Sequence, residues 1–261
     1  MYFKQSTHEY IIGDKPYTSF SSIIKLVEPE KDWDEIAAKY AKKNKMTVEA
    51  VKALWEEKGR VARERGTLFH SLKEDEDKLD TSQPVFFSEY EGDIKPIRNL
   101  ETLEDGIYPE LCLYNNEYQA CGMADKVIIE TIKGIRYVDI DDYKSSETID
   151  TESYYDNRNQ KFAMLAAPLN SIMDCNFMKY SLQLSMYAFF LEKYNFTPRK
   201  LTIKHLIIKD RELDPPKSEP KYNIDFENKK YYVQHEIDYE VKYLKKEVKT
   251  LLQFHKSKLK K

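Results

Sequence analysis

Two strand-like stretches in the middle of the chain constrain its fold most strongly. Residues 120–130, ACGMADKVIIE, and residues 135–146, IRYVDIDDYKSS, are rich in β-branched and aromatic residues, which favour β-strands. The four residues between them, TIKG, suit a tight turn, so the pair predicts a β-hairpin. Similar patterns predict further strands at residues 85–90, 108–114, 200–210 and 231–238.

Helical patterns surround these strands. Residues 33–73 predict two or three helical segments, and Thr47 is suited to cap the later one. Residues 178–194 predict a strongly apolar helix, which should be buried. A last helix is expected from about residue 239 to residue 256. This order predicts an α/β (α+β) sandwich in which helices flank a central mixed β-sheet.

The ends of the chain complete a single predicted domain, residues 1–261. Its N-terminal hairpin and helical segment, residues 1–75, begins with a hairpin over residues 9–24 and a turn at residues 13–16, GDKP. The acidic run KEDEDKLD, residues 73–80, predicts an exposed helix end or loop. The basic C-terminal helix, residues 239–261, is expected to pack an apolar face on the core, with phosphate contact as a second role.

The composition argues against several classes of protein. The chain is 41% hydrophobic and 33% charged, which is typical of a soluble globular protein. No stretch approaches the roughly 20 apolar residues that span a bilayer, and the N-terminus lacks a signal-peptide pattern. Because the three cysteines form no C-x-x-C pair, a disulfide framework or four-thiolate metal cluster is not expected, and a reducing cytoplasm is the simplest setting.

The net charge of −3 hides an uneven distribution. Residues 71–150 carry 20 acidic and 8 basic residues, whereas residues 241–261 carry eight lysines and one glutamate. A protein that binds a polyanion and buries metal-binding carboxylates would show this split. An acidic surface followed by a solvated basic tail would show it too, and for a charge run alone this simpler interpretation is favoured.

The stretch VDIDDYKSS, residues 138–146, contains the pattern D-x-K. On a strand, Asp142 and Lys144 share one face, while Asp139 and Asp141 point the other way. A carboxylate and an ammonium group that face a cleft together can hold a divalent cation beside a reacting phosphate. In isolation, the same pattern is more simply a surface ion pair.

Other residues supply partners for this pair. Asp125 lies one strand earlier in Gly122-x-x-Asp125, and Gly122 would allow close backbone approach. Glu110 lies on the strand before it, and three carboxylates suit Mg²⁺ or Mn²⁺ better than Zn²⁺. His70 follows Gly66 by one helical turn and could add an imidazole ligand.

The apolar helix adds a polar pair, Gln183 and Tyr187, which are four residues apart on one face. A buried glutamine needs hydrogen-bond partners. Its partner could be the site lysine or a substrate phosphate; alternatively, the amide could satisfy a backbone group in the core.

The ordered motifs together resemble one nuclease family. G-x-x-x-H at 66–70, P-E at 109–110, G-x-x-D at 122–125, D-x-K at 142–144 and Q-x-x-x-Y at 183–187 follow one another as in the RecB-like exonuclease branch of the PD-(D/E)XK nuclease superfamily. The resemblance covers roughly residues 10–210. Within that branch, the sequence is similar in particular to the stand-alone nucleases of tailed-bacteriophage replication and recombination modules.

This resemblance implies a restriction-endonuclease-like core and a set of roles. Asp125, Asp142 and the backbone carbonyl of Tyr143 would bind Mg²⁺ or Mn²⁺, as one or two ions. His70 would complete the first metal site, and Glu110 would bind or orient a second ion or its water. Lys144 would position and activate the attacking water. The remaining pair, Gln183 and Tyr187, would steady the site or contact the DNA backbone.

The sequence departs from the resemblance in two places. Some relatives carry four cysteines that bind an iron–sulfur cluster, and this chain has three, so no cluster is expected. The long gap at residues 145–178 is interpreted as a substrate-gating insertion.

The function predicted on this basis is metal-dependent hydrolysis of DNA, with an exonuclease acting on DNA ends in replication, recombination or repair as the leading hypothesis. The alternatives are a structure-specific endonuclease and a non-catalytic DNA-binding protein that keeps the fold. The retention of Asp125, Asp142 and Lys144 favours catalysis. The expected partner is DNA, and a helicase or a single-strand annealing protein is a possible second partner. No membrane association is expected. The expected location is the cytoplasm of a bacterial or phage-infected cell.

Overall fold

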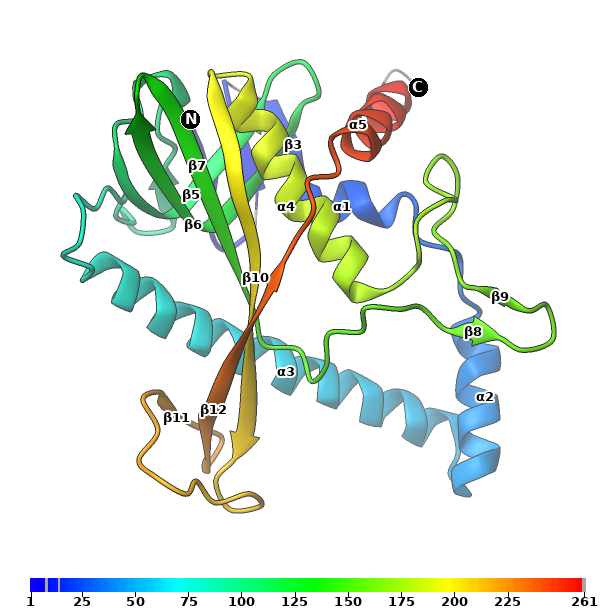
Figure 1. Cartoon of the computed structure of the whole chain (residues 1–261). Coiled ribbons are helices and arrows are strands. Elements are labelled where there is room, and N and C mark those ends of the chain that lie inside the picture. Colours follow the sequence, from blue (N-terminus) through cyan, green and yellow to red (C-terminus); the bar gives the residue numbers. More distant parts are fainter. Residues whose placement is uncertain (8, 14, 260–261) are drawn as a thin grey trace.

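A mixed β-sheet forms the centre of the protein in the computed structural model, and helices flank it (Figure 1). The structure describes residues 1–7, 9–13 and 15–259. The strands are β1 (Tyr2–Lys4), β2 (Glu9–Ile12), β3 (Lys15–Ser19), β4 (Ile94–Pro96), β5 (Gly106–Asn115), β6 (Ala120–Ile132), β7 (Ile135–Lys144), β8 (Tyr155–Asp156), β9 (Lys161–Phe162), β10 (Phe196–Asp210), β11 (Asn223–Phe226) and β12 (Lys229–Glu240). The helices are α1 (Phe20–Lys25), α2 (Trp33–Asn44), α3 (Val48–Lys78), the short 3-10 helix η1 (Leu100–Thr102), α4 (Asn176–Glu192) and α5 (Lys245–Leu259).

Ten strands of the described chain form one sheet. Their order is β11-β12-β10-β7-β6-β3-β2-β1-β4, and β5 pairs with β6 beside this path. β7 and β10 are parallel, as are β3 and β6, and the other neighbours are antiparallel. The predicted α+β fold with a central mixed sheet is therefore confirmed.

The strand β6 changes its partner along one edge. β3 pairs with Ala120 and Cys121, and β7 pairs with β6 only from Lys126 onward. The backbone of residues 122–125 therefore has no strand partner on this edge, and such groups need other hydrogen-bond partners when they are buried. This split in the sheet is where the predicted carboxylate Asp125 lies.

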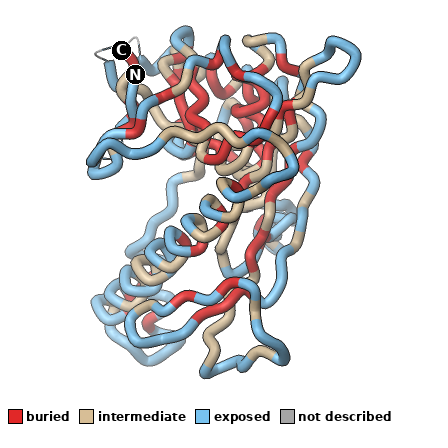
Figure 2. Tube along the Cα trace, turned by 90° about the vertical axis from the view of Figure 1, so that its left-hand side faces the viewer, coloured by how far each residue is buried: buried red, intermediate tan, exposed pale blue. Residues whose placement is uncertain are grey.

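The main hydrophobic core lies where the sheet meets α1, α4 and α5. Figure 2 shows most of the buried residues gathered in one half of the molecule; in the other half, the strand ribbon of β10, β11 and β12 buries a smaller hydrophobic cluster with Phe69 of the long helix α3. α4 is buried on almost every side, as its apolar sequence predicts. α5 buries Val248, Leu251 and Leu252, so its predicted packing on the core is also confirmed.

One predicted strand is wrong, and so is the predicted start of the last helix. Residues 85–90 form no strand, because Val85 makes only an isolated bridge to Ile107. The last helix begins at Lys245 rather than near residue 239, since Tyr239 and Glu240 still pair with β10 and extend β12. Pairing with a neighbouring strand here overrides the local helical preference of the sequence.

The N-terminal region needs two corrections as well. The hairpin of β2 and β3 ends at Ser19, which caps α1 by accepting a hydrogen bond from Ser22 N–H. The acidic run belongs to the last turns of α3, where Lys73 and Asp77 are buried rather than exposed. Thr47 caps α3 as predicted, accepting from Ala50 N–H at 3.1 Å. Asp14 of the predicted turn and the terminal Lys260 and Lys261 lie outside the described residues.

Candidate active site

A cleft of about 690 Å³ lies between α3, the N-terminal strands and β6. Five of the predicted site residues line it: His70, Glu110, Asp125, Gln183 and Tyr187. The other three, Asp142, Tyr143 and Lys144, form the end of β7. That strand end lies beside β6, because the N–H of Tyr143 donates to Asp125 Oδ2 at 2.6 Å. The structure thus brings all the predicted residues to one region.

The end of β7 sorts its aspartates by face, as predicted. Asp142 is only 1% exposed, and its Oδ2 forms an ion pair with Lys144 Nζ on the same face. Asp139 instead accepts two hydrogen bonds from Arg199, at 2.9 and 2.6 Å. Asp141 lies on the rear of the sheet beside basic residues. Asp142 is therefore the aspartate of this stretch that belongs to the site.

The helix α3 brings His70 to the site. His70 Nδ1 lies 3.6 Å from Asp125 Oδ2. One turn earlier, a Cβ on Gly66 would lie 2.7 Å from Ser145 Oγ, so a larger residue would require the Ser145 side chain to move. Gly66 thus favours the close packing of α3 against the residue that follows β7, one turn before His70.

Glu110 interrupts β5 without changing its register. Pro109 and Leu111 pair with Lys126 and Ala124 of β6, so Glu110 lies opposite Asp125, and it has a φ of 51°. A left-handed non-glycine residue is strained, and such strain is concentrated at functional sites. The Glu110 carboxylate lies at the cleft, which this residue lines.

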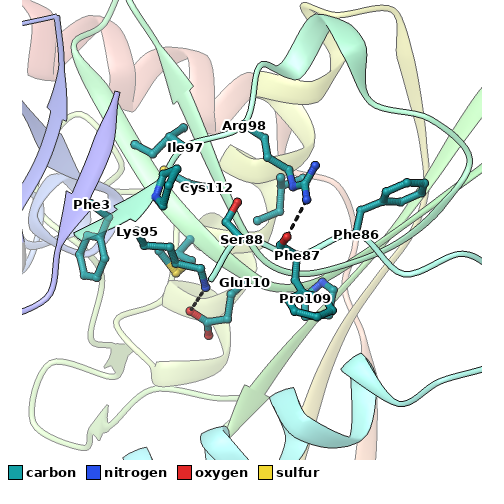
Figure 3. Close-up of a pocket in the computed structure, with 13 residues that line it drawn as sticks. Phe3, Phe86, Phe87, Ser88, Lys95, Ile97, Arg98, Pro109, Glu110 and Cys112 are labelled. Atoms are coloured by element: carbon teal, nitrogen blue, oxygen red, sulfur yellow. Dashed lines mark hydrogen bonds and ion pairs between the residues drawn. The ribbon is translucent and has the colours of Figure 1, made fainter. Parts of the chain in front are cut away.

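A buried lysine lies behind this carboxylate. Lys95, on β4, is 3% exposed, and its Nζ lies 3.7 Å from Glu110 Oε2 and 3.8 Å from Glu74 Oε1. Figure 3 shows Lys95 and Glu110 facing each other in a small pocket beside Phe3 and Cys112. Lys95 therefore orients and partly neutralises Glu110.

Gln183 and Tyr187 bond to each other and to β6. Gln183 Nε2 donates to the Tyr187 hydroxyl at 2.8 Å, which donates to the carbonyl of Met123 at 2.5 Å. That carbonyl belongs to the segment of β6 that has no strand partner on the edge shared by β3 and β7. The amide and phenol therefore fasten α4 to the split in the sheet, which matches the core role left open from the sequence rather than a bond to Lys144.

Gly122 has a different role from the predicted one. A Cβ at this position would lie 2.5 Å from Phe20 Cδ2, so the space is already filled by an aromatic ring. Phe20 in turn packs against Tyr187 and Phe190, with ring centroids 5.2 and 4.9 Å apart. Gly122 serves aromatic packing beneath the site, not backbone approach to an ion.

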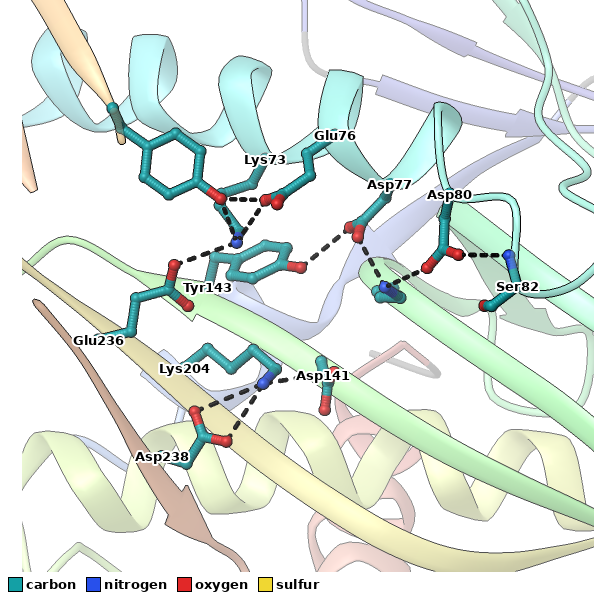
Figure 4. A network of polar contacts seen from close by, with 12 residues as sticks. Lys73, Glu76, Asp77, Asp80, Ser82, Asp141, Tyr143, Lys204, Glu236 and Asp238 are labelled. Carbon is teal, nitrogen blue, oxygen red and sulfur yellow. Dashed lines mark hydrogen bonds and ion pairs between the residues drawn. The ribbon is translucent and has the colours of Figure 1, made fainter. Parts of the chain in front are cut away.

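A buried polar network supports the site from the rear of the sheet (Figure 4). Asp77 of α3 accepts hydrogen bonds from Lys126 Nζ at 2.7 Å and from the Tyr143 hydroxyl at 3.0 Å. Lys126 follows Asp125 in β6, and Tyr143 lies between Asp142 and Lys144 in β7. One buried carboxylate thus holds the immediate chain neighbours of the site residues.

The charges of the site perturb one another. Burial and the carboxylate of Asp142 raise the pKa of Asp125 to about 8, although Lys144 opposes this shift. Burial, followed by the charge of Asp125, raises the pKa of Glu110 to about 7. Burial alone would lower the pKa of Lys144, but Asp142 and Asp125 raise it above its usual value. Burial and Lys144 lower the pKa of His70, which favours the neutral imidazole that binds metals.

The residues fit a hard divalent cation in their chemistry. Asp125 and Asp142 are buried carboxylates that repel each other, and a nearby cation would remove the reason for the raised pKa of Asp125. Oxygen ligands of this kind suit Mg²⁺ or Mn²⁺. Within the described residues, however, no three His, Cys, Asp or Glu side chains already stand together as a metal-binding group.

Sequence reasoning missed Lys95 and Asp77. A lone lysine between apolar residues in a three-residue strand carries little signal. Asp77 carries more, because it lies seven residues after His70, and two helical turns place both on nearby faces of α3. Because residues 73–80 were expected to be exposed, the spacing between His70 and Asp77 was not used.

No family model matches the sequence, and no curated protein is significantly similar to it. Among the described helices, none combines the length and apolar character needed to cross a bilayer.

Proposed function

We propose that this chain is a metal-dependent deoxyribonuclease of the RecB-like PD-(D/E)XK type. Its leading form is an exonuclease that acts on DNA ends in replication, recombination or repair, in the cytoplasm of a bacterial or phage-infected cell. One observation carries the proposal: Lys144 is paired with the buried Asp142 at a strand end that is hydrogen-bonded to Asp125. A lone surface ion pair would not be buried next to a second carboxylate.

The residues divide into those that would hold the ion and those that act on the substrate. Asp125, Asp142 and the carbonyl of Tyr143 would hold Mg²⁺ or Mn²⁺, and His70 and Glu110 stand at the edge of the same group. When bound, the ion polarises the phosphate and makes its water a better nucleophile.

Lys144 supplies a fixed positive charge. Its pKa is raised above the usual value, so the ammonium remains protonated at neutral pH and can donate hydrogen bonds. Such a group stabilises negative charge that develops on a phosphate, or orients the attacking water. Since its partner Asp142 is buried, the ammonium is held in place before the substrate arrives.

The remaining residues hold the geometry. Gln183 and Tyr187 fix α4 against β6, and Lys95 orients Glu110. Together they keep the cleft open beside the carboxylates, where a phosphodiester can enter.

A cleavage assay tests the proposal. End-labelled linear DNA and covalently closed circles, each single- and double-stranded, are incubated with Mg²⁺, Mn²⁺ or EDTA. We expect metal-dependent loss of linear DNA, abolished in Lys144→Met and Asp125→Asn and kept in Lys200→Ala, which removes an exposed lysine of the adjacent strand. Circular dichroism checks that each variant is folded.

The outcomes separate the alternatives. Cutting of circles would identify an endonuclease. Metal-independent binding without any cleavage would favour a non-catalytic DNA-binding protein. Activity that persists in folded Lys144→Met would contradict the catalytic role of the D-x-K pair.

A further inference from the structure

The helix α2 and the first half of α3 project from the body of the protein as a helical arm, residues 33–63 (Figure 1). α2 packs mainly against α3. It buries only Ala37 and Ala41, which join Val51 in a small hydrophobic cluster separate from the main core. Because the arm contributes little to the main core, we consider it as a binding surface rather than as a support of the fold.

The tip of the arm is strongly basic. Lys39, Lys42, Lys43 and Lys45 occur within seven residues that contain no acidic residue, and all four are exposed. Of these four, Lys39 alone takes part in an ion pair within the described chain, at 2.6 Å from Glu35. The other ammonium groups are therefore available to a polyanion.

The arm also carries exposed aromatic rings. Trp33 is 61% exposed and Tyr40 is 37% exposed. Both rings pack edge-on against Trp55, with centroids 6.3 and 5.6 Å away, which holds them in place while leaving surface free. Rigid aromatic rings beside basic groups are the usual platform for the unpaired bases of a single strand.

The helix α3 leads from this platform to the cleft. Fifteen residues separate Trp55 from His70, which is roughly 22 Å of helix. Arg63 lies between them, is exposed, and lines the cleft. Gly59 lies one turn before Arg63, and a Cβ there would meet only Arg63 Nη1, at 3.2 Å. Among the described residues, no atom of another element lies within 4 Å of that Cβ position, so a ligand can approach the helix there beside the guanidinium.

We propose that the arm binds single-stranded DNA and guides it past Arg63 into the cleft. The lysines contact phosphates, and Trp33 stacks on a base. The inference rests on the proposed nuclease function, because it names the form of the substrate that the same cleft receives. It places that contact on the arm rather than on the basic C-terminal helix α5.

The two tryptophans of the chain both lie on the arm, which makes the arm directly observable. Intrinsic tryptophan fluorescence is followed while a single-stranded oligonucleotide is added in EDTA, so that no cleavage occurs. Anisotropy of a labelled oligonucleotide measures total binding in parallel. We expect tryptophan quenching that saturates together with the anisotropy.

Matched variants locate the contact. Lys42→Ala/Lys43→Ala removes two exposed lysines of the arm, and Lys246→Ala/Lys249→Ala removes two exposed lysines of α5. Each phosphate contact contributes a salt slope of about −0.7 on a single strand, hence a factor of about five in affinity at 0.1 M salt relative to 1 M. The arm variant should therefore bind roughly 25-fold more weakly with a salt slope smaller by about 1.4, and the α5 variant should bind like the wild type.

Three results would overturn the inference. Binding without tryptophan quenching would place the DNA elsewhere, and an equal loss in both double variants would deny the arm a special role. In both cases metal-dependent cleavage would still stand. Absence of any DNA binding would refute the proposed function and this inference with it.

Discussion

The raised pKa of Asp125 makes the stability of the metal-free protein depend on pH. Its carboxyl is hydrogen-bonded to Tyr143 N–H and faces Asp142, Lys144 and His70. The pKa of Asp125 in the folded protein, about 8, exceeds the ordinary value of 3.8 that the unfolded chain would show. The contribution of the protonated Asp125 carboxyl to the stability of the fold is therefore fully present below about pH 4, and it is lost as the pH rises toward 8. Glu110, with a pKa of about 7, acts in the same direction.

The substitution Asp125→Asn should remove most of this dependence. Asparagine keeps an acceptor for Tyr143 N–H but carries no charge. Each unit of pKa is worth about 1.4 kcal/mol, and relaxation with water entry would leave about half of the full value, so we expect roughly 3 kcal/mol for Asp125. At pH 9 without metal, the variant should exceed the wild type by about that amount, and at pH 4 the two should be nearly equal.

Urea denaturation at pH 4, 7 and 9, with EDTA or excess Mg²⁺, measures the effect. Mg²⁺ at 100 times its dissociation constant should stabilise the wild type by about 2.7 kcal/mol and the variant far less. Asp139→Asn is the control, because Asp139 faces away from the site and pairs with Arg199. A wild type whose stability is equal at pH 4 and pH 9, or a variant destabilised equally at every pH, would refute the reasoning.

Two further substitutions test the supports of the site. Asp77→Asn weakens a buried ion pair with Lys126, and breaking such a pair usually costs about 3 to 5 kcal/mol of stability. Because Asp80 lies 3.8 Å from the same ammonium group and partly replaces the lost charge, we expect a loss of about 2 to 3 kcal/mol in urea denaturation. DNA cleavage should fall as well. Asp238→Asn, at a side chain 50% exposed, should cost under about 1 kcal/mol, and equal losses would contradict a special role for Asp77. Gly122→Ala should lower the melting temperature by overpacking Phe20, at about 1 to 3 kcal/mol; an unchanged melting temperature would show that the ring can move away.

The sequence predicted which of these residues lie close together better than it predicted where the strands and helices begin and end. The alternation of side chains along β7 separates Asp142 and Lys144 from Asp139 and Asp141, and this depends only on strand geometry. The spacing from Gly66 to His70 likewise depends only on the helical turn. Local periodicity of this kind is unaffected by the rest of the chain.

The features that escaped prediction depend on partners distant in sequence. β12 extends through Glu240 because β10 is long enough to pair with it, and no local pattern at residue 240 contains that information. Lys95 appears unremarkable until β4 joins the sheet and brings it within 3.7 Å of Glu110. Lys73 and Asp77 look like solvated charges until Tyr222, and Glu236 of β12, supply partners for Lys73, and β6 and β7 supply partners for Asp77.

The split in the sheet explains why these features coincide. A continuous partner along β6 would satisfy the backbone of residues 122–125 and cover Asp125. Because β3 pairs with β6 only as far as Cys121 and β7 only from Lys126 onward, the Met123 carbonyl between them accepts a hydrogen bond from the Tyr187 hydroxyl instead, and the side chain of Asp125 accepts one from Tyr143 N–H. The same interruption that costs strand pairing thus leaves a buried carboxylate facing a cleft, and α3 closes that cleft with His70. The proposed chemistry is located where the sheet is incomplete.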